Sequence, residues 1–401
     1  MEVSKNLLNV YSDIRGDIYR RALEMEKAGE KVLKLNTGNP AAFGFKMPDS
    51  IKNKVIESFD TALGYCHIQG MEEAREAIKD YHLSLGVNDI TADDVFIGNG
   101  VSEVASMVIS ALVGTDDEVL LPSPCYSLWT NFTNLSGGRS VFYSCREEDN
   151  WQPDTESIKN KITKKTKAIV LINPNNPTGA MYSKEVLKEI VNIARKNNLV
   201  IISDEIYDRL ILDEKEHIPT ATLSDDVVVV TTNGLSKSHC ICGLRCGWAV
   251  ISGAKKEREK LKEALVRIAS IRLCPNTLVQ LAIEAALKDN DYTKEMLREK
   301  GRLKEQRDIC VSELSEISGI SFVPNQAAFY IFPRLDIKRF GFKSDRDFAG
   351  RLLEEKKILI VPGSGFSAED NEHFRIVMLP RKDELKNAIS GMADFLKKHI
   401  I

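Results

Sequence analysis

Six short apolar runs alternate with helical patterns through the middle of the chain, and this alternation limits the available folds most strongly. The runs show no polar alternation, which is typical of strands covered on both faces. Helical patterns over residues 101–113 and 184–196 separate some of them. We therefore expect an α/β domain with a mostly parallel sheet. The expected strands are residues 95–97, 118–121, 168–172, 199–203, 227–231 and 247–251.

The sequence pattern changes after residue 251. Residues 254–317 are charged and helical, with Pro275 expected to break the run. This pattern predicts a smaller α+β domain built from both termini. Its expected strands are residues 31–36, 328–332, 358–361 and 374–378, and its expected helices are residues 14–27, 345–355 and 382–399. We expect residues 46–270 to form the large domain, and residues 1–45 and 271–401 the small one.

The composition is that of an ordinary globular protein. The 401 residues are 43% hydrophobic and 28% charged, and the length suits two domains better than one small core. The net charge of -3 argues against a nucleic acid or an anionic membrane as the main partner. The start lacks a basic segment followed by an apolar run, and no stretch approaches the roughly 18 apolar residues of a membrane-spanning helix. We expect a cytoplasmic protein.

The eight cysteines are interpreted as reduced thiols. Cys240, Cys242 and Cys246 form a cluster that raises the question of a zinc site. Structural zinc sites normally show two separated ligand pairs, and no second pair follows at a suitable distance. We therefore expect no metal.

Two motifs at expected strand ends carry an anion site and an amine. A strand runs into Gly98 and Gly100 and then into a helix that begins near Ser102. Backbone N–H groups and the dipole at a helix start attract anions, although Ser102 or Asn99 as a simple helix cap fits the same residues. Lys237 follows the strand at 227–231, at the sheet edge where ligands bind in such folds. Most lysines are surface residues, so Lys237 alone decides nothing.

Two further motifs supply a carboxylate and an amide. Asp204 closes the apolar strand at 199–203, and burying its charge is costly without a cationic partner. That partner is either a ligand with a protonated ring nitrogen or a nearby Arg or Lys. Asn176 lies in the loop 173–179, which follows another buried strand and is also consistent with a plain turn.

Each of these four motifs alone also has a plain structural interpretation, but together they favour one ligand. Pyridoxal phosphate (PLP) requires an anion site for its phosphate, a lysine for a Schiff base, and an acid facing its pyridine nitrogen. All of these are expected at one edge of one sheet. The motifs therefore predict a PLP enzyme whose cofactor is carried by Lys237.

The order of these motifs resembles the class I aminotransferases of PLP fold type I. The resemblance runs from residues 36–40 through residues 64–70 to residues 374–376, nearly the whole chain. Within that family the chain is most similar to the bacterial alanine (glutamate–pyruvate) aminotransferases, which is carried by residues 11–16, 38–45 and 270–274.

The resemblance implies a role for each residue around the cofactor ring. Lys237 matches the Schiff-base lysine, and Asp204 matches the acid on the pyridine nitrogen. Tyr207 and Asn176 match the donors to the ring hydroxyl oxygen, and Tyr126 matches the aromatic residue that stacks on the ring. Lys237, Asp204 and Tyr207 are the implied catalytic residues.

The resemblance also implies how the phosphate is held. Val101, Ser102, Ser236 and Arg245 match residues at the phosphate group. Tyr65 matches a tyrosine that reaches the phosphate of the neighbouring subunit, which implies a homodimer with shared active sites.

The implied activity is ping-pong transamination between an L-amino acid, with alanine favoured, and a 2-oxo acid such as 2-oxoglutarate or pyruvate. Arg375 matches the arginine that binds the substrate α-carboxylate, helped by Gly38 and Asn176. Arg15 fits a second anchor for the distal carboxylate of glutamate, or equally a helix-surface arginine. Tyr11 and Trp129 are expected to line the same pocket.

Other functions fit the same cofactor residues. A C–S lyase, an amino-acid decarboxylase, and an aspartate, aromatic or branched-chain aminotransferase all remain open, because a fold does not fix its chemistry. A non-catalytic PLP-sensing regulator is disfavoured, since residues 1–30 are too short for a DNA-binding module.

Overall fold

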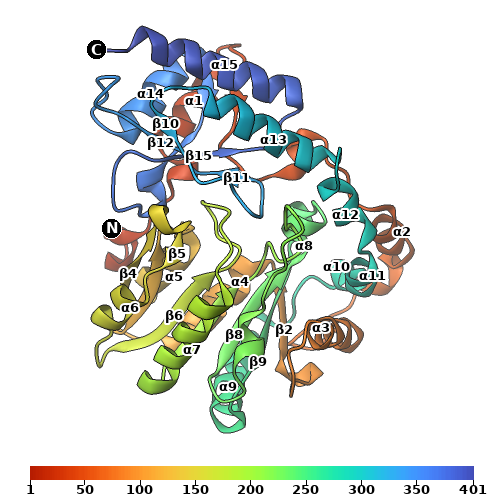
Figure 1. Ribbon diagram of the computed structural model, residues 1–401. Coiled ribbons are helices and arrows are strands. Elements are labelled where there is room, and N and C mark those ends of the chain that lie inside the picture. The colour runs from red at the N-terminus through yellow and green to blue at the C-terminus, as the bar shows by residue number, and fades with distance from the viewer.

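The computed structural model describes residues 1–401, apart from the side chain of Asp13. Its centre is an eight-stranded sheet (Figure 1). In spatial order the strands are β2 (Val95–Asn99), β9 (Cys246–Ser252), β8 (Val229–Gly234), β7 (Val200–Asp204), β6 (Thr166–Ile172), β3 (Glu118–Ser123), β4 (Arg139–Arg146) and β5 (Gln152–Pro153).

The sheet is mostly parallel, as the sequence predicts. Strands β8, β7, β6, β3 and β4 pair in parallel, whereas β9 runs antiparallel to both of its neighbours and β5 runs antiparallel to β4. All six strands expected from apolar runs lie in this sheet. The sequence pattern missed β4 and β5. In β4 only Tyr143 and Cys145 are buried, so it lacks the continuous apolar run by which the inner strands are identified.

Helices cover both faces of the sheet, because successive side chains of each strand point to opposite faces. In β6, Ile169 and Leu171 join one core, and Val170 and Ile172 join the other. The first core includes side chains of α3 (Glu72–Ser84), α6 (Thr155–Lys161), α7 (Lys184–Asn197) and α11 (Ile283–Lys288), and the second those of α4 (Val101–Leu112), α5 (Ser127–Leu135) and α9 (Lys255–Arg272).

A smaller α+β layer lies above the sheet in Figure 1 and has its own core. Phe348, Phe374 and Phe395 are buried at its centre. Its helices are α1 (Asp17–Lys27), α13 (Arg302–Ser315), α14 (Asp345–Lys356) and α15 (Lys382–Lys398). Its strands are β1 (Leu33–Lys34), β10 (Ile320–Ser321), β11 (Tyr330–Ile331), β12 (Arg334–Leu335), β13 (Ile358–Leu359), β14 (Val361–Pro362) and β15 (Phe374–Val377).

Both termini contribute to this layer, because β1 pairs with β13 and α1 packs on α14. Two expected elements differ in detail. The first helix begins at Asp17 and not at residue 14, because Gly16 is extended and separates it from a 3₁₀ turn over Asp13–Arg15. The strand expected at 358–361 splits into β13 and β14, which pair with different strands.

The helical stretch after β9 is broken more often than Pro275 alone predicts. It forms α9, α10 (Thr277–Gln280), α11, α12 (Asp291–Leu297) and α13. Leu273, which has a positive φ of 73°, ends α9. Helix α11 then packs against α3 and against α2 (Asp49–Glu57).

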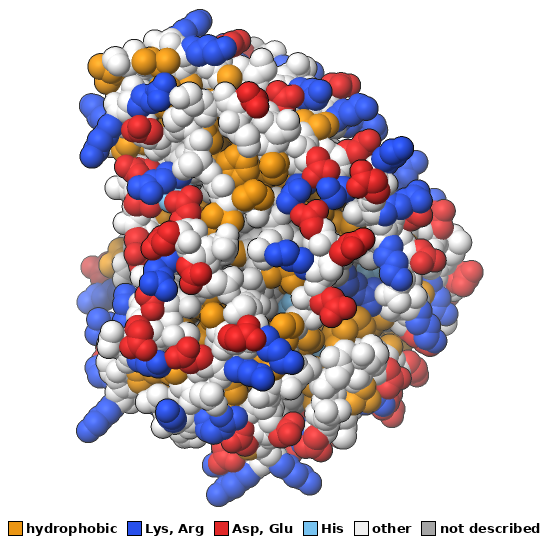
Figure 2. All heavy atoms as spheres, viewed as in Figure 1, with side chains coloured by type: hydrophobic (Ala, Val, Ile, Leu, Met, Phe, Trp, Pro, Cys, Tyr) orange, Lys and Arg blue, Asp and Glu red, His pale blue; other side chains and the backbone are white. Residues whose placement is uncertain are grey.

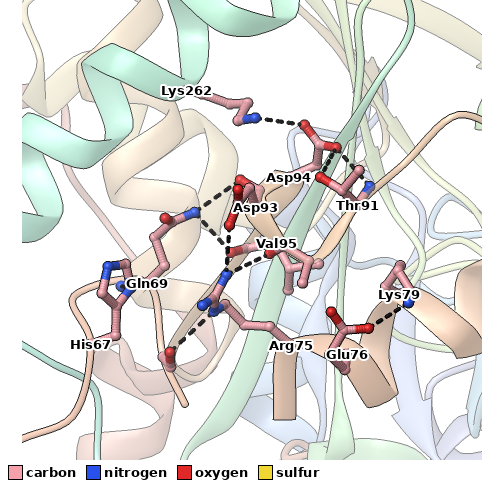
Figure 3. Close-up of polar contacts among 12 residues, drawn as sticks. His67, Gln69, Arg75, Glu76, Lys79, Thr91, Asp93, Asp94, Val95 and Lys262 are labelled. Atoms are coloured by element: carbon pink, nitrogen blue, oxygen red, sulfur yellow. Dashed lines mark hydrogen bonds and ion pairs between the residues drawn. The ribbon is translucent and has the colours of Figure 1, made fainter. Parts of the chain in front are cut away.

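Two buried side chains anchor the segment that precedes α3 to the start of β2 (Figure 3). Gln69 Nε2 donates to the carbonyl oxygens of Asp93 at 3.0 Å and Val95 at 3.3 Å. Arg75 donates to Gly70 O at 3.1 Å and to Ala92 O at 2.9 Å. Residues 67–70 are therefore fixed to the edge of the sheet.

The surface shows no dominant charge on the face drawn in Figure 2, where acidic and basic side chains are interspersed with small apolar patches. None of the described helices combines the length and the hydropathy that crossing a membrane requires.

Candidate active site

A cavity of about 640 Å³ opens at the carboxyl ends of β6, β7 and β8, between the sheet and the smaller layer. The sheet edge and the smaller layer both contribute to its wall. Of the site residues expected from the sequence, Tyr65, Tyr11 and Trp129 lie outside the cavity wall. The others line it together: Arg15, Gly38, Val101, Ser102, Tyr126, Asn176, Asp204, Tyr207, Ser236, Lys237, Arg245 and Arg375.

The start of α4 forms a cradle for an anion. Gly100 precedes the helix with φ of 84°, and a Cβ there would lie 2.4 Å from Arg245 Nη2. A Cβ on Gly247 would lie 2.4 Å from the Val101 nitrogen. These two glycines let the guanidinium and strand β9 approach the helix start closely. With the nearby hydroxyl of Ser102, the N–H groups and the arginine charge suit a phosphate group.

Asp204 ends β7 as a carboxylate that is only 4% exposed. It accepts hydrogen bonds from Trp129 Nε1 at 3.0 Å and from the Ile206 N–H at 3.4 Å. Burial raises the pKa of Asp204 to about 6, and these two hydrogen bonds only partly oppose the increase. A cation held against the carboxylate would restore its ionised form, which is what a protonated ring nitrogen provides.

Trp129 and Tyr11 do not line the cavity as expected. Trp129 is fully buried, because it packs in the core that the sheet shares with α4, α5 and α9, and its indole N–H contacts Asp204. The Tyr11 hydroxyl lies 3.3 Å from Ser367 Oγ, outside the residues that form the wall.

Lys237 lies on the short helix α8 (Leu235–Ser238), directly after β8. Its Nζ donates to the carbonyl oxygen of Gly38 at 2.8 Å. A side chain at Gly38 is excluded, since its Cβ would lie 2.3 Å from the Tyr330 hydroxyl oxygen. The glycine therefore brings main chain of the smaller layer directly to the lysine.

Tyr207 forms a pair with Tyr330, whose presence in the site the sequence did not predict. The two hydroxyl oxygens lie 2.8 Å apart, and the rings meet edge to face. Burial, followed by the neighbouring Tyr330, raises the pKa of Tyr207 well above its ordinary value. Tyr207 therefore keeps its proton at neutral pH and can donate it in a hydrogen bond. In the sequence, Tyr330 places a hydroxyl group in an otherwise apolar run, and this feature could have marked it as a candidate site residue.

Arg375 is only 1% exposed, yet its hydrogen-bond partners are uncharged. It donates to Asn176 Oδ1 at 2.9 Å and to the Asn36 carbonyl oxygen. Its Nε finds no partner among the described residues. The rings of Tyr330 and Phe366 flank the guanidinium at 4.4 and 4.6 Å from their centroids. A buried cation with neutral partners is well suited to receive a carboxylate.

Two expected residues lie farther out. Arg15 reaches the cavity wall from the 3₁₀ turn before α1, but remains largely exposed at the mouth. Tyr65 is 84% exposed and lies outside the wall of this cavity.

The cysteines after Lys237 point to different places. Cys240 packs in the core of the smaller layer, Cys246 packs in the core beneath β9, and Cys242 lines the cavity. Among the described side chains, no three His, Cys, Asp or Glu residues are arranged to hold a metal ion.

Comparison with known proteins identifies the family of the chain. The model of the family "Aminotransferase class I and II" matches residues 30–391. Glutamate-pyruvate aminotransferase AlaA of Haemophilus influenzae is 46% identical over 396 residues, covering 99% of this chain and 98% of the relative. Alanine aminotransferase of Mycobacterium tuberculosis is 43% identical, covering 98% of this chain and 92% of the relative.

Solved structures agree. An aminotransferase from Escherichia coli superposes with a TM-score of 0.98 at 45% identity, covering 100% of this chain and 99% of that one. Alanine aminotransferase from Pyrococcus furiosus gives a TM-score of 0.94 at 40% identity, covering 99% and 100%.

The chain therefore belongs to the class I and II aminotransferases. It is an enzyme with the fold type I architecture, and its cofactor is PLP, as the sequence predicts. The cavity fits that cofactor: a cradle of N–H groups and an arginine for the phosphate, a lysine for the aldehyde, and a buried acid without a strong cationic partner for the ring nitrogen.

Replacing Trp129 with Phe should raise the pKa of Asp204 in the cofactor-free protein above about 6, because the indole N–H stabilises the ionised form. The pKa of Asp204 is higher in the folded state than in the unfolded state. The folded state therefore loses stability as the pH increases from the ordinary pKa of an aspartate, 3.8, to about 6. In the wild type this loss is about 3 kcal/mol. In Trp129→Phe it should be larger and extend to higher pH.

The measurement is urea unfolding of the cofactor-free protein from pH 4 to 8. Asp204→Asn, which cannot ionise, supplies the background from all other groups. If the wild type and Asp204→Asn lose stability in parallel across this range, the assigned pKa of Asp204 is wrong.

Proposed function

We propose that the chain catalyses reversible transamination between L-alanine and 2-oxoglutarate, giving pyruvate and L-glutamate, with Lys237 carrying PLP. The observation that supports this most is the convergence of Lys237, Asp204 and Arg375 in one cavity beside the cradle at α4. The preference for alanine and glutamate is supported by the relatives named glutamate-pyruvate and alanine aminotransferase.

Each residue of the cavity has a distinct task in holding the cofactor. Arg245, Ser102, Ser236 and the N–H of Val101 would bind the phosphate, and Tyr126 would stack on the ring. All five residues line the cavity. Together they would hold the cofactor against Lys237, and such positioning is a large part of the rate enhancement.

When bound, PLP supplies an electron sink for the charge that develops on the substrate α-carbon. Asp204, whose orientation is fixed by the hydrogen bond from Trp129, would keep the ring nitrogen protonated. Tyr207 and Asn176 would donate hydrogen bonds to the ring hydroxyl oxygen. Lys237 Nζ would be the general base that removes the proton from the substrate α-carbon, and would hold that proton as a general acid for the next step.

Arg375 binds the substrate α-carboxylate through its planar fork of two parallel N–H donors. The side-chain amide oxygen of Asn176 accepts a hydrogen bond from Arg375, and the backbone at Gly38 lines the same cavity. Arg15, exposed at the mouth, provides a second positive charge for the distal carboxylate of glutamate. Alanine has no distal carboxylate and needs only Arg375, so the same pocket accepts both substrates.

We also propose a homodimer in which Tyr65 reaches the phosphate of the partner's active site. Tyr65 and Leu63 are 84 and 79% exposed, and Ile271 and Leu273 are 85 and 51% exposed. The two segments are adjacent, since Arg272 donates to the Ile68 carbonyl oxygen and Thr277 to that of Ala62. Large apolar side chains gathered in this way are typical of protein interfaces. An interface there would bury them and carry Tyr65 to another chain.

The division into a large domain of residues 46–270 and a small domain of residues 1–45 and 271–401 remains our proposal. It is supported by the separate core of the smaller layer. We further propose a cytoplasmic location, which the eight free cysteines favour.

The half-reaction tests this function directly. Mixing the PLP form with single amino acids should convert the cofactor to pyridoxamine phosphate with L-alanine, yielding pyruvate, and with L-glutamate, yielding 2-oxoglutarate. Absorbance and product analysis follow the reaction, and Lys237→Ala should show no turnover. Release of ammonia, carbon dioxide or a thiol instead would identify a lyase or a decarboxylase.

Replacing Arg375 with Lys should raise the KM for both amino acids roughly tenfold to hundredfold, because one of two parallel charge-assisted hydrogen bonds is lost. Arg15→Gln serves as the matched control and should raise the KM for glutamate while leaving that for alanine nearly unchanged. Steady-state kinetics with each substrate give both values. Equal effects of Arg15→Gln on the two substrates would contradict its assignment to the distal carboxylate.

Mixed dimers test the shared site. Tyr65→Ala and Lys237→Ala chains are each expected to be impaired alone. After the two are unfolded and refolded together, half of the dimers should be mixed, and each mixed dimer carries one intact site. Activity should rise toward roughly a quarter of the wild-type value. Mixtures that give only the sum of the separate activities would show that Tyr65 acts within its own chain or not at all.

A further inference from the structure

Tyr330 contacts both a tyrosine assigned to the cofactor and the arginine assigned to the substrate. It begins β11 of the smaller layer, lines the cavity and is only 2% exposed. Its hydroxyl oxygen lies 2.8 Å from that of Tyr207, and its ring centroid lies 4.4 Å from the Arg375 guanidinium. The hydroxyl and the ring of Tyr330 therefore contact two different parts of the proposed active site.

The position of the Tyr330 hydroxyl is fixed by its surroundings. The ring meets that of Tyr207 edge to face, with the centroids 5.7 Å apart. The main chain at Gly38 covers the hydroxyl so closely that no side chain fits there. Tyr207 is the only described residue that forms a hydrogen bond with this hydroxyl. The proton of Tyr330 therefore has one acceptor within the protein, the hydroxyl oxygen of Tyr207.

The two hydroxyls supply two protons for two different contacts. A tyrosine hydroxyl carries one proton and donates one hydrogen bond, and its oxygen can also accept. The proposed contact of Tyr207 with the ring hydroxyl oxygen of PLP uses the Tyr207 proton. The hydrogen bond between the two tyrosines is then formed only if Tyr330 is its donor.

Tyr207 retains its proton at neutral pH. Burial and the neighbouring Tyr330 raise its pKa well above the ordinary value. Two charged groups also act on it: Arg375 lowers the pKa and Asp204 raises it. The Tyr207 hydroxyl is therefore able to accept from one side and donate on the other.

We propose that Tyr330 is a positioning residue, which donates a hydrogen bond to the Tyr207 oxygen and thereby directs the Tyr207 proton to the ring hydroxyl oxygen of PLP. This inference rests on the proposed role of Tyr207. Hydrogen bonds arranged in a chain polarise one another, so the bond from Tyr330 makes the Tyr207 hydroxyl a stronger donor. Tyr330 thus acts on the cofactor through Tyr207.

A pH titration of the absorbance of enzyme-bound PLP, without substrate, tests this role. A hydrogen bond donated to the ring hydroxyl oxygen stabilises its ionised form, so the chromophore loses its proton at a lower pH. Tyr207→Phe removes that bond and should raise the proton affinity of the chromophore roughly tenfold to hundredfold. Tyr330→Phe only weakens the bond and should raise the affinity roughly twofold to threefold. The titration midpoint should move to higher pH in both variants.

The double variant shows whether Tyr330 acts through Tyr207. Adding Tyr330→Phe to Tyr207→Phe should leave the midpoint where Tyr207→Phe alone places it, because the hydroxyl through which Tyr330 acts is already absent. Tyr143→Phe is the matched control. The Tyr143 hydroxyl is fully buried outside the cavity and donates to the Val170 carbonyl oxygen at 2.8 Å, so its loss should leave the midpoint unchanged.

Steady-state kinetics with L-alanine separate this role from a contribution of Tyr330 to substrate binding. Tyr330→Phe keeps an aromatic ring over Arg375, so KM should stay within about twofold of the wild-type value while the midpoint moves. A large increase in KM with an unmoved midpoint would show that Tyr330 acts on Arg375 instead, and would overturn the proposal.

The titration also separates this inference from the role of Tyr207 on which it rests. An unmoved midpoint in Tyr207→Phe would show that Tyr207 does not bind the ring hydroxyl oxygen, and both roles would be wrong. If Tyr207→Phe moves the midpoint, two outcomes overturn the role of Tyr330 alone: an unmoved midpoint in Tyr330→Phe, or shifts that add in the double variant. Because no substrate is present, the titration does not depend on which amino acid the enzyme uses.

Discussion

The buried carboxylate of Asp204 is the constraint around which the active site is organised. A carboxylate at the end of an inner strand is costly when water is excluded, and the protein offers it only an indole N–H and a backbone N–H. The fold therefore carries an unbalanced acid that a bound cation completes. In our proposal the surrounding groups hold that cation in place, with the phosphate cradle at one end and the lysine at the other.

The two layers of the protein meet at this point, and each supplies a different part of the chemistry. Lys237, Asp204 and the cradle come from the sheet, whereas Arg375 and Gly38 come from the smaller layer. Hydrogen bonds from Lys237 to Gly38 and from Arg375 to Asn176 cross between them. A substrate carboxylate that binds Arg375 therefore acts on a contact between the layers, so substrate binding and the fit of the layers are physically linked.

The inner strands could be predicted because both of their faces are covered, which leaves continuous apolar runs in the sequence. Strand β4 could not, since water reaches much of it and only Tyr143 and Cys145 are buried. The residues at strand ends were likewise identifiable, because parallel strands deliver them to one edge. The environment of Trp129 was not, since its contact with Asp204 joins residues 75 positions apart. The same holds for Tyr330, whose partner Tyr207 lies 123 positions away.

The position of Trp129 also has an optical consequence. The chain has three tryptophans, and Trp151 and Trp248 contact His373 and His82 respectively. Trp129 instead touches Asp204, the acid that we propose faces the cofactor ring, so its indole is the fluorophore placed to transfer excitation to PLP bound there. Cofactor loss will therefore be visible as recovered tryptophan emission, without any added label.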